Sequence, residues 1–116
     1  MKAVIYHNPR CSKSRATLEL LTERGVEPEI IHYLETPPSP SELKRILKLL
    51  DRSAPEIIRF KEAQAKQQGL SASDQRSEDE WLDILATTPK LLERPIVVID
   101  GKAAIGRPPE NVLALL

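Results

Sequence analysis

Cys11, the only cysteine of the 116-residue chain, is the residue whose surroundings best suit it for chemistry. It lies in the segment His7-Asn8-Pro9-Arg10-Cys11-Ser12-Lys13-Ser14-Arg15, where four side chains that can carry positive charge fall within four residues of it. This segment joins an apolar run to a helical pattern, so Cys11 is expected at a helix N-terminus. Unpaired N–H groups and a partial positive charge stabilise a thiolate there. The sequence therefore predicts a reactive thiolate with a lowered pKa.

The alternative is that Cys11 is a small buried hydrophobic residue, as free cysteines most often are, but its polar and basic neighbours favour the reactive interpretation. A helix N-terminus also attracts oxyanions, so a nucleophile and an anion site would coincide. Ser14 completes a Cys-x-x-Ser pattern, and its hydroxyl is expected to cap the helix. Because the chain has no second thiol to resolve an oxidised Cys11, turnover requires a thiol from outside.

His7 lies four positions before Cys11 and is a candidate to support the thiolate or a proton transfer. The alternative is a strand-end histidine that bonds only to backbone, and His32 is assigned to packing. Two separated histidines and one cysteine form no zinc pattern, and the loop is too poor in glycine for a P-loop, so we expect no metal and no nucleotide. Further polar residues of the loop are expected to support the site: Asn8, Ser12, Lys13, Ser14 and Arg15.

Three arginines lie at breaks in the chain, where neighbouring backbone restricts their direction: Arg59, Arg94 and Arg107. Guanidinium groups suit tetrahedral oxyanions because they donate bidentate, charge-assisted hydrogen bonds. If Pro95 opens a strand beside the cysteine loop, Arg94 comes close to Cys11, and Arg107 is expected there too. The alternative for each arginine is a solvated surface position.

The composition is that of one globular domain of ordinary size, with 41% hydrophobic and 29% charged residues. Seventeen basic and seventeen acidic residues cancel, so we expect no nucleic-acid partner and no anionic membrane surface, and we expect a monomer. No apolar run approaches the roughly 20 residues that cross a bilayer. A single cysteine suits a reducing compartment, and we expect a cytoplasmic protein.

Short apolar runs predict four strands, at residues 3–6, 29–33, 95–99 and 102–105. Asp100-Gly101, between the last two, is the signal of a type I′ hairpin turn. A helix is predicted from about Ser14 to Arg24, which makes a βαβ unit with parallel strands. A last helix after Pro109 is expected to turn three apolar residues inward: Val112, Leu115 and Leu116.

The middle of the chain is predicted to be an all-helical section. Ser39 and Ser77 are predicted helix caps, each followed three residues later by a glutamate and then by apolar residues at helical spacing. We therefore expect one domain, residues 1–116, with a helical insertion at about 39–88. The element order, with a cysteine at the start of the first helix, predicts an α/β, thioredoxin-like fold with a four-stranded mixed sheet.

Four separated motifs together resemble the glutaredoxin-coupled arsenate reductases of the ArsC family, a group that also contains Spx-like regulators. These motifs are the cysteine segment from Ile5 to Arg15, residues 31–38, Leu92-x-Arg94-Pro95-Ile96-Val97-Val98, and Gly106-Arg107-Pro108. The resemblance covers essentially the whole chain and implies a thioredoxin-like fold with a helical insertion.

The resemblance also implies roles for these residues. The cysteine matching Cys11 attacks arsenate, the arginines matching Arg59, Arg94 and Arg107 hold the oxyanion, and the histidine matching His7 assists the cysteine. Pro95 would match the cis-proline of thioredoxin-like sites. No cofactor is implied as bound. Glutathione is the co-substrate that attacks the arsenic adduct, and glutaredoxin then removes the glutathione so that arsenite leaves.

Two other functions stay open within the same family. One is a thiol oxidoreductase that acts on glutathionylated substrates, and the other is a non-enzymatic, Spx-like transcriptional regulator that binds RNA polymerase. Against the regulator, this chain has Cys-x-x-Ser where that group has Cys-x-x-Cys. Arg10, Ser12 and Lys13 occupy loop positions where many reductases have smaller or neutral residues, and this difference bears on anion affinity or substrate choice.

Overall fold

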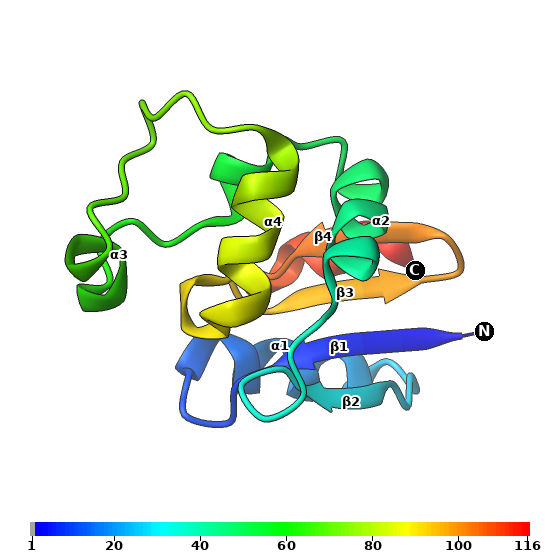
Figure 1. Cartoon of the computed structure of the whole chain (residues 1–116). Helices are drawn as coiled ribbons and strands as arrows, with labels where there is room; N and C mark the ends of the chain where they lie inside the picture. Colours follow the sequence, from blue (N-terminus) through cyan, green and yellow to red (C-terminus); the bar gives the residue numbers. More distant parts are fainter. Residues whose placement is uncertain (1) are drawn as a thin grey trace. The chain divides into compact units, whose positions relative to one another are not determined.

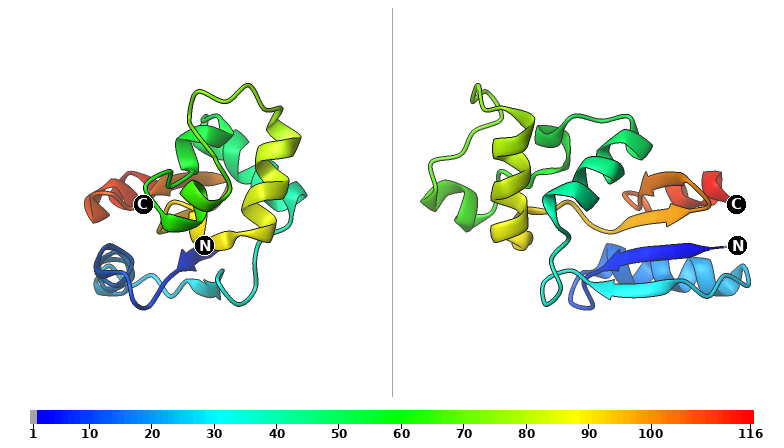
Figure 2. Two further views of the ribbon diagram at one scale, coloured as in Figure 1. Left: turned by 60° about the vertical axis from the view of Figure 1, so that its left-hand side comes forward. Right: turned by 45° about the vertical axis from the view of Figure 1, so that its right-hand side comes forward.

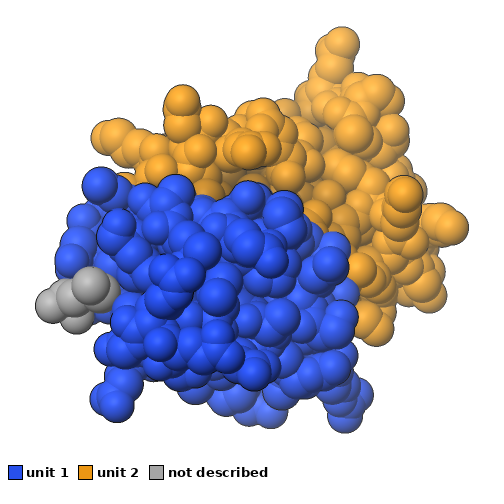
Figure 3. Space-filling view, turned by 180° about the vertical axis from the view of Figure 1, so that it is seen from behind, with its two compact units in different colours: residues 1–36, 94–116 blue, residues 37–93 orange. Residues whose placement is uncertain are grey.

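The computed structural model describes residues 2–116 and divides the chain into two compact units (Figure 1 and Figure 3). The sheet unit comprises the chain up to Thr36 together with Arg94–Leu116, and the helical unit comprises Pro37–Glu93. The helical unit therefore interrupts the sheet unit between its second and third strands. The prediction of a single domain with an insertion stays a prediction.

The sheet unit is built on a four-stranded mixed sheet, as predicted. Its strands are β1 (Ala3–His7), β2 (Glu29–His32), β3 (Ile96–Ile99) and β4 (Lys102–Ile105), in the spatial order β2-β1-β3-β4. β1 pairs with β2 in parallel, and β3 is antiparallel to both β1 and β4. This order, with a helix directly after β1, is the thioredoxin-like arrangement that the element pattern predicts.

One face of this sheet carries the core of the unit. Ala3 and Ile5 alternate along β1 and pair in register with Ile99 and Val97 of β3, so their side chains share a face. Leu21 and Val112 belong to the same buried cluster. Helix α1 (Ser12–Glu23) and the 3₁₀ helix η3 (Pro109–Leu115) therefore cover this face together (Figure 1 and Figure 2).

The turn between β3 and β4 has the predicted geometry. Asp100 and Gly101 both have positive φ, at 48° and 81°, as a type I′ turn requires. Asp100 is held from the other side as well, because its carboxylate accepts a hydrogen bond from the Lys2 backbone at 2.8 Å. Because β4 is antiparallel to β3, its last residue lies at the end of the sheet where β1 ends and the cysteine loop begins.

The helical unit contains α2 (Pro40–Leu50), α3 (Ala63–Gln67) and α4 (Glu78–Thr87), with short 3₁₀ helices η1 (Ala54–Ile57) and η2 (Pro89–Leu91). Ser39 caps α2 by accepting from the N–H of Glu42, and Ser77 and Glu80 form the predicted reciprocal capping box of α4. α2 and α4 pack through buried side chains: Leu43, Ile46, Leu47, Trp81, Leu82 and Leu85. Each such burial stabilises the unit by roughly 1.5–3 kcal/mol before entropy is counted.

The structure corrects two details of the sequence analysis. α1 begins at Ser12, two residues before the predicted start, because the chain turns helical directly after Cys11. The last helix is a 3₁₀ helix that ends at Leu115, and Leu116, which follows it, is 47% exposed instead of turned inward. Residues 51–88 contain no strand, as predicted, although Ile58 forms an isolated bridge with Leu92.

In the described part of the chain, no helix combines the length and apolarity needed to cross a membrane.

Candidate active site

Cys11 occupies the N-cap position of α1, between the end of β1 and the first helical turn. Its backbone is extended, with φ −94° and ψ 122°, and its N–H donates to the carbonyl oxygen of Asn8 at 3.0 Å. The side chain is 8% exposed. Cys11 is therefore a buried residue held at the helix N-terminus.

The pKa of Cys11 is lowered. Burial acts first and in the opposite direction, because it raises the pKa of a thiol, but four positively polarised groups outweigh it. In decreasing order these are the backbone N–H of Ser14, the charge of Arg94, the backbone N–H of Lys13 and the side chain of Arg107. The lowered pKa thus comes from the helix terminus and from two arginines that are distant in sequence, whereas the basic side chains adjacent in sequence are not among its causes.

Arg107 is fixed against the cysteine by two hydrogen bonds. Its Nε donates to the carbonyl oxygen of Arg94 at 2.8 Å, and its Nη2 donates to Cys11 Sγ at 3.7 Å. The side chain of Asn111 donates to the carbonyl oxygens of Ile105 and Arg107, at 3.3 and 3.0 Å, which steadies the loop from behind. The sequence-based expectation that Arg94 and Arg107 lie near Cys11 agrees with this geometry.

Arg94 leaves part of its guanidinium without a partner. Its Nε and Nη1 are buried and have no hydrogen-bond partner among residues 2–116. Such donors are costly to bury unless an acceptor is supplied, and a guanidinium most favours a carboxylate-like or tetrahedral oxyanion. Arg94 is followed by a cis peptide bond to Pro95, as the family resemblance implies, and the Arg107–Pro108 bond is also cis.

Gly106 allows the loop that carries Arg107 to lie against the rest of the site. Its N–H donates to the carbonyl oxygen of Pro95 at 2.9 Å. A Cβ at this position would lie 2.5 Å from Thr17 Oγ1 and 2.8 Å from Pro95 Cγ. Thr17 itself is anchored to the carbonyl oxygen of Lys13 at 2.8 Å, so the neighbour has little freedom to move. Only glycine fits between α1 and Pro95 at this point.

His7 contacts Ser14 rather than the cysteine. Its Nδ1 lies 2.6 Å from Ser14 Oγ, and the same oxygen accepts a hydrogen bond from the N–H of Asn8 at 3.0 Å. Ser14 is completely buried in the first turns of α1. The prediction that its hydroxyl caps the helix is therefore wrong, because the helix begins two residues earlier and the hydroxyl faces β1 and the loop.

The rest of the loop is held by hydrogen bonds between its side chains and its own backbone. The side chain of Asn8 accepts from the N–H of Arg10 at 3.0 Å, and Arg15 donates from Nη1 to the carbonyl oxygen of Pro9 at 2.9 Å. Ser12 and Lys13 are exposed in the first turn of α1. Asn8 and Arg15 thus shape the loop, as expected of supporting residues, while Lys13 is placed to contribute through its N–H.

Arg59 lies in the helical unit, where its side chain forms an ion pair with Glu62. Its backbone N–H donates to the carbonyl oxygen of Leu91 at 2.7 Å, beside the bridge between Ile58 and Leu92. Because Arg59 and Cys11 belong to different units, a role of Arg59 at the cysteine stays a prediction.

A cavity of about 230 Å³ adjoins the cysteine loop within the sheet unit. It is lined by His7, Asn8, Pro9, Arg10, His32, Leu34 and Glu35. The rings of His7 and His32 meet edge to face there, with centroids 6.0 Å apart. His32 is exposed, so its assignment to packing holds only for this contact with His7.

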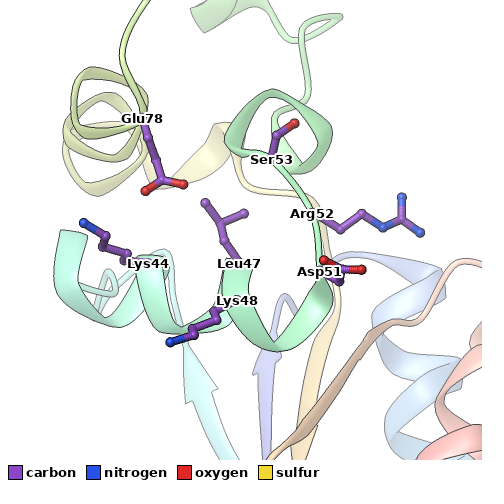
Figure 4. Close-up of a pocket in the computed structure, with 7 residues that line it drawn as sticks. All are labelled: Lys44, Leu47, Lys48, Asp51, Arg52, Ser53 and Glu78. Atoms are coloured by element: carbon purple, nitrogen blue, oxygen red, sulfur yellow. The ribbon is translucent and has the colours of Figure 1, made fainter.

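A second hollow, of about 580 Å³, lies in the helical unit (Figure 4) and is lined by Lys44, Leu47, Lys48, Asp51, Arg52, Ser53 and Glu78. None of the predicted site residues lines it, and its rim mixes both signs of charge. Within residues 2–116, no group of three or more histidine, cysteine, aspartate and glutamate side chains is arranged to hold a metal ion.

Sequence reasoning did not identify Thr17, Gly106 and Asn111 as parts of the site. Thr17 bonds to the carbonyl oxygen of Gly106, 89 residues away, and only the fold reveals this contact. Asn111 bonds to the carbonyl oxygen of Arg107, four residues away, and its type alone gave no signal of this contact. For Gly106, a signal was present in the Gly106-Arg107-Pro108 motif. A glycine directly before a fixed arginine indicates close backbone approach.

The ArsC family model matches residues 6–115, nearly the whole chain and every residue of the sheet-unit site. The chain belongs to the ArsC family. This membership agrees with the position of Cys11 after β1 and with the two arginines that meet it.

Individual ArsC relatives are similar over almost their full length. The chain is 54% identical to the uncharacterized protein YfgD of Escherichia coli K12 over 113 residues, which cover 97% of this chain and 94% of the relative. It is 51% identical to the arsenate reductase of Neisseria meningitidis serogroup A, with 97% and 96% covered. The solved structure of the arsenate reductase from Vibrio cholerae superposes with a TM-score of 0.95 at 50% identity, and covers 100% of this chain and 98% of that one.

Proposed function

We propose that this ArsC-family protein is an arsenate reductase in which the Cys11 thiolate forms a covalent adduct with arsenic, and that glutathione and glutaredoxin supply the electrons. The observation that carries the proposal is the pair of unpartnered, buried N–H donors of Arg94 beside a cysteine of lowered pKa. The arsenate reductases of Neisseria meningitidis and Vibrio cholerae, each about half identical to this chain, support the choice of substrate.

Electrostatics explains why such a site needs arginines. Arsenate is an anion at neutral pH, and an approaching thiolate is repelled unless cations screen both partners. Arg107 faces Sγ directly, and Arg94 has free donors for the oxyanion. Preorganised donors of this kind stabilise the charge that develops as sulfur bonds to arsenic. Arg59 is the proposed third arginine.

The first step leaves arsenic in its original oxidation state. Cys11 Sγ forms a bond to arsenic while an arsenate oxygen departs, protonated, as water. The thiol of glutathione then replaces a second oxygen, which also leaves as water. Reduction occurs when a glutaredoxin thiolate attacks the glutathione sulfur: the sulfur–arsenic bond breaks, its electron pair stays on arsenic, and a mixed disulfide leaves. Water then releases arsenite and returns Cys11 to its thiol form.

The sequence supports the need for an external reductant. Cys11 is the only cysteine of the chain, so the two electrons that reduce arsenic cannot come from the formation of a disulfide within the chain. Both oxidised sulfurs must therefore come from other molecules, one from glutathione and one from glutaredoxin. A lone thiol that must return to the reduced state after each turnover suits a reducing compartment, and we propose the cytoplasm as the site of action.

The test is arsenate-dependent oxidation of NADPH in an assay that couples glutathione, glutathione reductase and glutaredoxin to the purified protein. Turnover should require arsenate, glutaredoxin and Cys11, so the Cys11→Ser variant should lose it entirely. A Lys44→Ala variant, changed at an exposed position of the helical unit, serves as the matched control and should retain full activity.

Absence of turnover from a protein whose Cys11 reacts readily near neutral pH would remove the arsenate assignment. Activity on glutathionylated peptides under the same conditions would then indicate a thiol oxidoreductase. Recovery of RNA polymerase subunits with the protein, unaffected by Cys11→Ser, would indicate a regulator.

A further inference from the structure

Ser14 joins two groups of the cysteine loop through one hydroxyl. Its side chain is completely buried, its Oγ accepts from the N–H of Asn8 at 3.0 Å, and His7 Nδ1 lies 2.6 Å from the same oxygen. A serine hydroxyl has one proton to donate and two positions at which it accepts. Because the Asn8 bond uses an acceptor position, the direction of the bond to His7 depends on where the hydroxyl proton goes.

Two arrangements are possible. If His7 Nδ1 carries a proton and donates it to Ser14, the hydroxyl proton needs another acceptor, and the side chain of Ser14 has none elsewhere in residues 2–116. A donor buried without an acceptor is costly. If the hydroxyl instead donates to an unprotonated Nδ1, every polar atom in the contact among Asn8, Ser14 and His7 is satisfied.

The surroundings of His7 disfavour its charged form, which would carry protons on both ring nitrogens. The pKa of His7 is lowered, first by burial and then by the nearby His32 and Arg15. Around the ring, the groups that can carry charge come from β2 (His32), from α1 (Arg15) and from the cavity lining (Arg10 and Glu35). A neutral imidazole has a single proton, and the hydroxyl geometry leaves that proton for Nε2.

We propose that Ser14 is a positioning residue that holds His7 as a neutral imidazole protonated on Nε2, so that His7 acts as a hydrogen-bond donor and not as the base that deprotonates Cys11. Nδ1 is occupied by the serine hydroxyl and cannot take up the thiol proton. This assignment concerns the protein without substrate, and only its bearing on catalysis rests on the proposed function.

Three further observations agree with these separate roles of His7 and Ser14. His7 is absent from the groups that lower the pKa of Cys11, which are two backbone N–H groups and two arginines. Ser14 supplies one of those N–H groups from its backbone while its hydroxyl holds His7. His7 also lines the cavity beside the loop, so its remaining ring proton is available to a molecule bound there.

The experiment is a long-range ¹H–¹⁵N correlation spectrum of the full chain labelled with ¹⁵N-histidine, recorded near neutral pH. The chain has two histidines, so a His32→Gln variant assigns both sets of signals. We expect the Nδ1 of His7 at the shift of an unprotonated nitrogen and its Nε2 at that of a protonated one. A protonated Nδ1, or shifts averaged between the two tautomers, would overturn the proposal.

Variants of Ser14 test the positioning role itself. Ser14→Ala removes the donor to Nδ1 and should shift both His7 nitrogens towards values averaged over two tautomers, whereas Ser14→Thr keeps a hydroxyl and should restore the single pattern. An unchanged pattern in folded Ser14→Ala would contradict the role assigned to Ser14. If Ser14→Ala does not fold, the spectra of the wild type and of Ser14→Thr decide the question. None of these readouts needs arsenate turnover, so failure here and failure of the proposed function are separable.

Discussion

Arg107 donates from Nη2 to the sulfur of Cys11 at 3.7 Å, across 96 residues of sequence. The same guanidinium donates from Nε to the backbone of Arg94 at 2.8 Å, so its direction is set before any substrate arrives. One arginine therefore faces the nucleophile and is braced by the residue that offers free donors for an anion. The thiol and the proposed oxyanion site are therefore built as one structure.

Replacing Arg107 should make Cys11 less acidic. Arg107→Ala removes a side-chain donor to Sγ, and its loss raises the pKa of the thiol towards the ordinary value. The rate of alkylation by iodoacetamide, followed against pH, should show its midpoint at higher pH than in the wild type. Arg24→Ala, at an exposed position beyond the other end of α1, is the matched control and should leave the midpoint in place.

The acidity of Cys11 should also appear in the stability of the fold. The pKa of Cys11 is lowered in the folded state, whereas the pKa of the thiol in the unfolded chain is about 8.5. Once the pH is above the pKa of Cys11 in the folded state, the folded chain has released this proton while the unfolded chain still holds it. The free energy of unfolding therefore increases with pH until about pH 8.5 and then levels off. When the pH falls below the pKa of the folded state, this contribution to stability is lost.

Urea denaturation of the wild type and of Cys11→Ser across this pH range, with reductant present, measures the effect. The difference between the two proteins should grow in favour of the wild type as pH rises, while the contribution of His7 is common to both and cancels. A difference that shrinks with rising pH would mean that burial dominates and that the thiol is less acidic than an ordinary cysteine.

Arg94→Ala should separate activity from stability. If Arg94 stabilises the transition state, kcat/KM for arsenate should fall at least about tenfold. Because two of its nitrogens are buried without partners, the substitution removes an unfavourable feature, and the free energy of unfolding should stay the same or increase. Loss of stability with unchanged kcat/KM would instead make Arg94 a structural residue.

Gly106→Ala should destabilise the protein by about 1–3 kcal/mol, because the new methyl group meets the side chains of Thr17 and Pro95 at less than contact distance. Urea denaturation measures this cost. In the double variant with Thr17→Ala, part of the loss should return as a favourable coupling energy, since the closest of those contacts is removed. Strict additivity of the two single variants would show that the crowding is not the cause.

Ser39→Ala should cost about 1 kcal/mol of the free energy of unfolding, because the first turn of α2 loses the acceptor for the N–H of Glu42. Ser41→Ala, at an exposed position in the same turn, should change it by less than about 0.5 kcal/mol. Equal effects of the two substitutions would argue against a specific capping bond at Ser39.

Local signals made much of this architecture predictable. The apolar run of β1, the Asp100-Gly101 turn and the serine caps each act within a few residues, and the structure reproduces them. The role of Ser14 was missed because its hydroxyl could bond either forward into its own helix or back to His7. That choice depends on where the helix begins. The contact of Thr17 with the carbonyl oxygen of Gly106 joins residues 89 positions apart, which spacing does not reveal.

The cysteine loop and its arginines are assembled over very different distances along the chain. The bonds among His7, Asn8 and Ser14 span six or seven residues, whereas Arg107 meets Cys11 only after β3 has paired with β1. Wherever β3 is not paired with β1, Arg107 is not held against Cys11, and the thiol lacks one of the groups that lower its pKa in the folded chain. The acidity of Cys11 is therefore a property of the complete sheet unit and not of the cysteine loop alone.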